Sequence, residues 1–377
     1  MKRFLVGQWK GTSELGSYCN VSIEQEGCKL NGRTTMYATF TVEGKPFPII
    51  NFSTFNGDIK NKGTISGNVD LPSIHYRNGD YLTDQDIIYL KEKIGFEFPT
   101  STTFTAVRED KNKLNVKWKS IYPSLPPRED TVLLERVISA ESKIPHEEMP
   151  WNKFREFALS QSNDLIYRGQ SQPWMLQTAF HRIGRADIIS YLDNQVPDLE
   201  RHINSVSKHV FDVRDDRSLG ALLNLAQHHG YPTPLLDWTK SPYVSAFFAF
   251  EDINQVKKRK HVSIFIFEDR KWAEKVGRVA NIRAPNMLLR TLELPGFGNA
   301  RVLPQQSVTM FSNVADIESL IFVNETTKGE FVKAIAIPSS DREKAMRDLS
   351  LMGITWGSLF PGLDGICRQL RSRHFGQ

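Results

Sequence analysis

Apolar and polar positions alternate along the first 140 residues of the chain. Clear examples are the segments 33–42, 113–118 and 131–136. Because successive side chains of a strand point to opposite faces, this period of two predicts strands with one buried face. Tight turns are favoured between them by Asn31-Gly32, Glu43-Gly44, Asn56-Gly57 and Asn78-Gly79. Residues 1–140 are therefore expected to form an antiparallel β domain, as a single-sheet meander, a barrel or a sandwich.

The pattern changes from about Glu141. The segment 141–145 is typical of a linker, and apolar residues after Pro150 then recur at helical spacing. Further helices are expected at 199–213, at 219–228 and from residues 340 and 365, and strands at 165–169, 262–267, 307–311 and 332–337. Residues 141–377 are thus predicted to form a second domain of mixed α and β structure, which makes the whole chain α+β.

Composition narrows the class of protein. The 377 residues include 48 Lys and Arg against 43 Asp and Glu, and 40% are hydrophobic. The absence of an apolar run of about 18 residues argues against a membrane span, and the N-terminus becomes polar too soon for a signal peptide. We therefore expect a cytoplasmic protein with no membrane partner. The formal charge of +5 leaves a polyanionic partner open.

Several common chemistries are excluded by missing motifs. The chain has no Gly-x-x-x-x-Gly-Lys loop, no His-Glu-x-x-His and no Gly-x-Ser-x-Gly. The stretch 296–301 lacks the third glycine of a dinucleotide-binding loop. Adjacent His228 and His229 project to different faces of a helix, so we expect no metal site.

One stretch, residues 227–250, combines polar and apolar residues in an unusual way. A helix is predicted to end at Gly230, a short strand to follow around Leu235, and a new helix to begin at Pro242. Asp237 then lies at a strand end just before a helix N-terminus, where anion-binding and catalytic groups often gather. The alternative is that Asp237 only caps the turn.

This stretch resembles the FRG domain, a family named for a Phe-Arg-Gly motif. The matching blocks are 167–170 (Tyr-Arg-Gly-Gln), 229–249, 299–301 with 305–306, and 359–365. The resemblance covers about 151–370 and leaves the N-terminal domain unexplained. Tyr167 replaces the Phe, Pro234 stands where an Arg usually follows Pro-Thr, and Gly362 replaces an Asp.

The FRG family is in turn distantly similar to ADP-ribosyltransferases, and its members are similar to toxins or effectors of bacterial anti-phage systems. The resemblance implies a split sheet, NAD as co-substrate and no metal. The residues it implies as catalytic are Arg168, Asp237 and Gln306. Those it implies for binding NAD are Tyr167, Gln170, His229, Trp238, Thr239 and Tyr243.

In this interpretation Arg168 contacts the pyrophosphate or ribose, since a guanidinium is always charged and bidentate. Asp237 and Thr239 point the same way along their strand toward the ribose. Gln306 stands where transferases usually place a glutamate, and an amide cannot offset a full positive charge. The carboxylate then comes from Asp237, which we favour, or from Asp364.

Each of these residues also has a structural interpretation, in which it stabilises the fold and takes no part in binding or catalysis. In that interpretation Arg168 and Asp237 are partners in an ion pair. His229 ends a helix, and Trp238 belongs to the core. Gln306 is then a solvent-facing strand residue, and Asp364 caps the last helix.

The sequence therefore leads to a hypothesis of a cytoplasmic toxin or defence effector. It transfers ADP-ribose from NAD to a macromolecule, with RNA favoured over protein as the acceptor, and an antitoxin or regulatory protein is an expected partner. The N-terminal β domain recognises a partner or target. The alternative is a non-catalytic FRG module that binds a nucleotide or a phage component.

Overall fold

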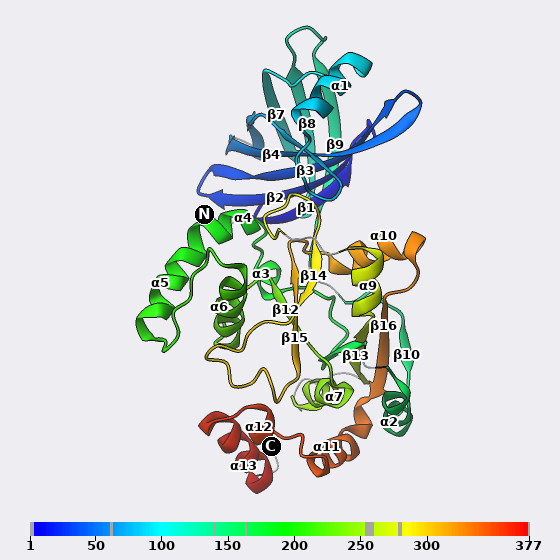
Figure 1. Cartoon of the computed structure of the whole chain (residues 1–377), viewed down its shortest axis with the longest axis vertical. Helices are drawn as coiled ribbons and strands as arrows, with labels where there is room; N and C mark the ends of the chain where they lie inside the picture. Colours follow the sequence, from blue (N-terminus) through cyan, green and yellow to red (C-terminus); the bar gives the residue numbers. More distant parts are fainter. Residues whose placement is uncertain are drawn as a thin grey trace.

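Two β-sheets organise the chain. The computed structural model describes residues 4–60, 63–138, 141–162, 164–252, 260–277 and 281–375. The first sheet forms the N-terminal domain, and the second lies at the centre of a mixed α/β domain (Figure 1). The predicted domain boundary at residue 140 lies outside the described residues. The last strand of the first sheet ends at Arg136, and the first strand of the second begins at His146.

The N-terminal sheet closes on itself. Among the described residues, eight antiparallel strands form a barrel in chain order, because β9 pairs with β1 and β3 pairs with both β2 and β4. They are β1 (Gly7–Thr12), β2 (Tyr18–Glu26), β3 (Lys29–Val42), β4 (Lys45–Ile59), β5 (Thr64–Val69), β7 (Ser101–Arg108), β8 (Lys113–Ile121) and β9 (Arg128–Arg136). β6 (Ser73–Tyr76) pairs with β4, and α1 (Asp84–Ile94) follows it. The predicted antiparallel β domain is confirmed, as a barrel.

The second sheet has seven strands within the described part of the chain, in the order β10-β16-β13-β11-β12-β15-β14. Their bounds are β10 His146–Glu148, β11 Ile166–Gln170, β12 Leu235–Thr239, β13 His261–Phe267, β14 Leu289–Leu292, β15 Ser307–Ser312 and β16 Val332–Pro338. β10 and β16 are parallel, and the other pairs are antiparallel. The predicted mixed α and β structure is confirmed.

Helices cover this sheet and extend beyond it. They are α2 Trp151–Ser160, α3 Ala179–Arg182, α4 Ile188–Ser190, α5 Val196–Val206, α6 Asp216–His228, α7 Pro242–Phe250, α9 Asp269–Lys275, α10 Ile317–Lys328, α11 Arg342–Leu351, α12 Trp356–Leu359 and α13 Leu363–Phe375. A π-helical turn, Tyr191–Gln195, leads into α5, and a 3₁₀ turn, Ser339–Asp341, precedes α11. α5 is shorter than the predicted 199–213, because the Asn204 side chain hydrogen-bonds both backbone groups of Phe211 and turns the chain back.

The sheet narrows at its centre. β11 and β12 share a single register pair, Tyr167 with Thr239. By contrast, β11 pairs with β13 over five positions, and β12 pairs with β15 over five. Away from this pair, β11 and β12 diverge and do not pair with each other. Polar side chains of the two strands can therefore lie in the gap between them.

The barrel rests on the second domain through the outer faces of β1, β2 and β3 (Figure 1). The polar contacts include the ion pairs Lys10–Asp316, Arg33–Asp187 and Glu24–Arg185, and hydrogen bonds of Gln8 with Asn313 and Ala315. α1 lies on the far side of the barrel (Figure 1). None of the described helices has the length and apolar character that crossing a membrane requires.

Candidate functional site

The Tyr-Arg-Gly segment on β11 divides its side chains between the two faces of the sheet. Tyr167 is 2% exposed and belongs to the core beneath α7, where burial raises the pKa of its hydroxyl to about 12. A Cβ at Gly169 would lie 1.8 Å from the carbonyl oxygen of Ser245 on α7. The glycine is therefore required for the close approach of α7, and Arg168 points to the opposite face.

Arg168 spans the gap between the diverging strands. Its Nη1 donates a 2.6 Å hydrogen bond to the main-chain oxygen of Asp237. Its Nε is buried and has no hydrogen-bond partner among the described residues. Burial lowers the pKa of the guanidinium to about 10, which still leaves it charged at neutral pH. A cation with an unused buried donor suits an anionic ligand.

Asp237 is the exposed residue of β12, between buried Leu236 and Trp238. Its Oδ1 accepts a 2.6 Å hydrogen bond from Nε2 of Gln227 on α6. The Gln227 amide oxygen in turn accepts the hydroxyl of Thr233. This chain of bonds fixes the direction of the carboxylate. Arg168 bonds the main-chain oxygen of Asp237 and not its carboxylate, so among the described residues the two do not form the ion pair of the structural interpretation, and the carboxylate stays accessible.

Arg182, at the end of α3, is a third charged member that the sequence analysis missed. The pKa of Arg182 is lowered by burial, and the Asp237 carboxylate counteracts this lowering. Burial is also the main cause that lowers the pKa of Arg168; Asp237 raises it and Arg182 lowers it further. We call Arg168, Arg182 and Asp237 the arginine–aspartate cluster. Arg182 lies on α3, a different element from the β11 strand of Arg168, and no motif or periodic pattern links the two, so no signal in the sequence pointed to Arg182.

A polar row on α6 continues this cluster. Asn224, Gln227 and His228 share one face of α6 because they lie three and four residues apart. The Asn224 amide contacts Thr309 on β15 at 3.3 Å and accepts a 2.7 Å bond from Asn299. Burial, with the nearby Arg301 cation, lowers the pKa of His228 to about 4. The family block at 299–301 therefore lies beside α6.

Gln306 does not lie in a strand. β15 begins at Ser307, and Gln306 is an exposed turn residue with a φ of 47°. Left-handed backbone at a residue other than glycine is strained and must be held by its surroundings. Here its carbonyl accepts a hydrogen bond from the Lys240 N–H at 3.0 Å. The interpretation of Gln306 as a solvent-facing strand residue is therefore wrong in its strand placement.

Several of the residues implied for NAD binding face the protein interior. Gln170 is buried and donates to the Trp174 carbonyl at 2.8 Å. Trp238 packs in the core with Phe267, since strand alternation places it opposite Asp237. Thr239 is 4% exposed, and its hydroxyl donates to the Gln305 carbonyl at 2.6 Å. Asp237 and Thr239 lie two residues apart, so their side chains point to the same face of β12. Asp237 is exposed, whereas Thr239 is buried.

His229 and Tyr243 are more accessible. His229 is exposed and ends α6, in line with its structural interpretation. Tyr243, in the first turn of α7, is half-buried with its ring edge-on to Trp151. Asp364 is in the first turn of α13. Burial lowers the pKa of Arg301, and the nearby Asp364 carboxylate counteracts this lowering. Arg301 lies over the Phe360 ring at 4.8 Å. Asp364 is therefore associated with Arg301 rather than with Arg168.

The FRG domain model matches residues 163–258. This range contains β11, α3, α6, β12 and α7, and with them the whole arginine–aspartate cluster. The match supports the FRG-domain family for this region. No curated protein matches the chain significantly. Among the described residues, no group of three or more His, Cys, Asp or Glu side chains is placed to hold a metal ion.

Proposed function

We propose that the second domain binds NAD at the arginine–aspartate cluster and transfers its ADP-ribose to a macromolecule. The observation that carries this proposal is the unpartnered Nε of Arg168 beside Arg182 and the accessible Asp237 carboxylate. Two guanidinium groups suit the two phosphates of a dinucleotide. The narrow junction between β11 and β12 supports a sheet of the split, ADP-ribosyltransferase-like kind.

Asp237 has the chemistry that the transfer requires. The glycosidic bond between ribose C1′ and nicotinamide breaks, and its electron pair neutralises the pyridinium nitrogen. The ribose carbon becomes positively charged, and a fixed carboxylate stabilises that charge. The acceptor nucleophile bonds to C1′ and loses its proton to solvent. Gln227 holds the carboxylate in place for this role.

The biological setting that we propose is a toxin or defence effector acting in the cytoplasm. RNA is the favoured acceptor because the chain has a formal charge of +5, and protein is the other acceptor class. An antitoxin or regulatory partner would restrain such an enzyme in its own cell. The barrel would recognise the partner or target.

A second candidate is a non-catalytic nucleotide-binding module. The observation that favours it is Gln306, an amide at the position expected for a glutamate. A binding measurement does not separate the two candidate functions, because both include binding of NAD. Release of nicotinamide separates them, since it requires the bond to break.

The test measures nicotinamide release and transfer of label from NAD carrying a radioactive adenylate phosphate, with RNA and protein fractions as acceptors. We expect Asp237→Asn to lower release at least 100-fold, since it removes the stabilising charge. Arg182→Ala should raise the KM for NAD about tenfold. Arg217→Ala on α6 is the matched control, because this exposed arginine lies outside the cluster. NAD binding without release supports the non-catalytic module, and absence of both rejects the proposal.

A further inference from the structure

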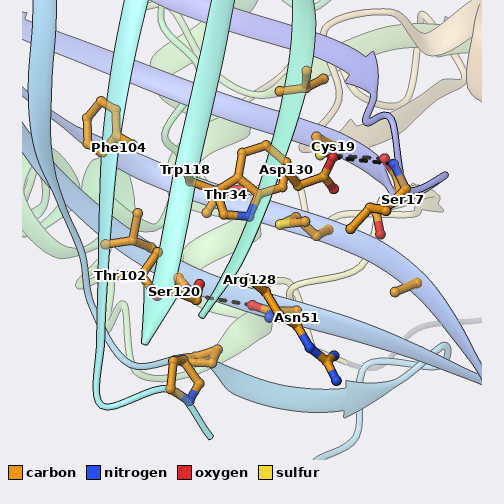
Figure 2. A pocket seen from close by; sticks show the side chains of 18 of the residues that line it. Ser17, Cys19, Thr34, Asn51, Thr102, Phe104, Trp118, Ser120, Arg128 and Asp130 are labelled. Atoms are coloured by element: carbon orange, nitrogen blue, oxygen red, sulfur yellow. Dashed lines mark hydrogen bonds between the residues drawn. The ribbon is translucent and has the colours of Figure 1, made fainter. Parts of the chain in front are cut away.

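The barrel of the N-terminal domain encloses a cavity of about 480 Å³. Small-molecule sites typically measure about 300–1,000 Å³, and an eight-stranded barrel has room for one small ligand. The cavity is lined by inward-facing side chains of the barrel strands, of which Figure 2 shows a selection. Its volume and position define a site separate from the arginine–aspartate cluster.

One end of the barrel is filled by protein. Trp9 is fully buried, and its indole N–H donates to the Leu5 carbonyl at 2.9 Å. The Arg136 guanidinium lies over the Trp9 ring at 5.5 Å and donates to the Phe4 carbonyl. Neither Trp9 nor Arg136 lines the cavity. Ligand access is therefore expected from the other end.

The other end is covered by a loop. Ile94, the last residue of α1, and residues 95–99, which follow it, line the cavity together with the tips of the strands. The Glu97 carboxylate accepts hydrogen bonds from both the backbone N–H and the hydroxyl of Ser124. Phe96 packs edge-on against Phe40 and Phe98. The hydrogen bonds to Ser124 are exposed to solvent, so the loop is suited to admit a ligand.

The wall of the cavity is largely apolar and aromatic. Phe104 and Trp118 are register partners on β7 and β8, and Phe55 meets Phe104 edge-on at 5.7 Å. All three side chains line the cavity. Such a wall favours a ligand with a flat ring body, because aromatic pairs add to the energy of area burial.

A buried carboxylate interrupts this apolar wall. Asp130 is 8% exposed, and the hydrogen bonds that described residues make to its side chain, from the N–H groups of Leu15 and Thr131, both go to Oδ1. Figure 2 shows it near Cys19, Ser17 and Trp118. The Cys19 thiol is neutral, since burial and Asp130 raise its pKa to about 12. Oδ2 is therefore available to a ligand donor.

The buried charge in the cavity favours a cation. Four acidic residues lie along the cavity, but Asp70 and Glu129 are exposed and Glu129 forms ion pairs with Lys117 and Lys119, so the buried carboxylate is that of Asp130. Arg128 is the cation among the described lining residues, and its guanidinium lies over the Tyr122 ring at 5.6 Å. No described residue forms an ion pair with Asp130, and an unpaired buried carboxylate is costly.

We propose that the barrel is a binding site for a small amphipathic amine. The ring of the ligand packs against Trp118 and Phe104, and its ammonium group donates a hydrogen bond to Asp130. The barrel contacts the second domain through outward-facing residues such as Lys10 and Arg33, so the cavity is independent of that interface. The site is then a ligand-sensing element that precedes the FRG-like domain.

Calorimetric titration of the full chain tests this proposal, with tryptamine as the probe. Indole-3-propionate is the matched anion with the same ring, and indole is the neutral ring alone. We expect tryptamine to bind at least tenfold more tightly than either, because a charge-assisted hydrogen bond adds to ring burial. Equal affinity for the anion, or no binding of tryptamine at 1 mM, overturns the proposal.

Two variants locate the binding site. Asp130→Asn should weaken tryptamine binding at least tenfold, while its amide oxygen still accepts the two backbone N–H groups. Glu135→Gln is the control on the same strand, since Glu135 is exposed outside the barrel and should leave binding unchanged. If Asp130→Asn does not fold, Thr34→Phe, which fills the cavity from β3, should abolish binding. Unchanged affinity in a folded Asp130→Asn or Thr34→Phe protein rejects the barrel site.

Discussion

The barrel and the second domain place their polar groups in opposite ways. In the barrel, the interior is hollow, and the buried carboxylate of Asp130 faces the cavity. In the second domain, both faces of the sheet are filled by apolar clusters. The charged residues Arg168 and Asp237 there lie where β11 and β12 separate. A closed sheet offers its inside as a site, whereas an open, covered sheet offers only the ends and gaps of its strands.

The two sites also differ in charge. Among the described residues that line the barrel cavity, the buried charged side chain is Asp130, which favours an amine. The arginine–aspartate cluster has two guanidinium groups and one carboxylate, which favours a phosphate-bearing ligand. We therefore propose that the same chain has two sites of opposite selectivity. This difference can be tested separately in each domain.

The largest expected effect tests how tightly the second domain is packed. Gly169→Ala places a Cβ 1.8 Å from the Ser245 carbonyl, so α7 must move away from β11. We expect a loss of about 3 kcal/mol or more in the free energy of unfolding. Gly57→Ala in the barrel is the matched control, because its Cβ would lie 3.0 Å from the nearest atoms and a small shift relieves it. Calorimetric unfolding that shows equal losses for both variants would contradict the difference in packing.

The next effect concerns the cluster. Arg168→Lys keeps the charge but cannot both bond the Asp237 carbonyl and present a second donor to a phosphate. We expect the KM for NAD to rise at least tenfold, which corresponds to about 1.4 kcal/mol of binding. Arg217→Lys should leave KM unchanged, since Arg217 is an exposed residue of α6. A KM within twofold of the wild type for Arg168→Lys would show that the guanidinium geometry is not used.

The sequence predicted the barrel better than it predicted the cluster. Strict alternation and Asn-Gly turns are local signals, and they sufficed to predict an antiparallel β domain. Arg168 and Asp237 were identified by motif and do lie together. Arg182 was missed because it reaches the cluster only through the packing of α3. Trp238 was assigned to NAD binding. Its neighbour Asp237 is exposed, and because successive side chains of a strand point to opposite faces, Trp238 lies in the core.

A third prediction concerns acid stability, and it applies to the second domain. His181 is 5% exposed, and burial lowers the pKa of its imidazole to about 3. The unfolded chain has the ordinary value of 6.5, so it binds the proton more readily. The contribution of His181 to stability is full above pH 6.5 and is lost as the pH falls toward 3. Between pH 6.5 and 5 the second domain should lose about 2 kcal/mol.

Proton NMR of the His181 ring checks this directly, because its chemical shift should stay constant down to pH 4. His181→Gln should flatten the pH dependence of unfolding between pH 5 and 6.5. His75, the buried histidine of the barrel, has a pKa lowered mainly by burial and serves as the comparison. A His181 resonance that titrates near pH 6.5 would contradict the prediction.

The smallest expected effect tests how far the two domains depend on each other. Lys10 of the barrel lies 2.6 Å from Asp316, whose side chain is 7% exposed. Burial opposes the charged form of Asp316, but the hydrogen bonds from Lys10 and Ser319 outweigh it and lower the pKa. The contribution of this carboxylate is full above its ordinary pKa of 3.8 and is lost as the pH falls through the lowered value. Asp316→Asn should therefore cost about 1 kcal/mol at neutral pH and remove this acid dependence.

The control is Glu135→Gln, which breaks the more exposed pair with Lys113 within the barrel and should cost almost nothing. The measurement is the separation of the barrel and second-domain unfolding transitions by calorimetry: it should widen in Asp316→Asn alone, and an equal change in both variants would mean that the interface pair has no special role.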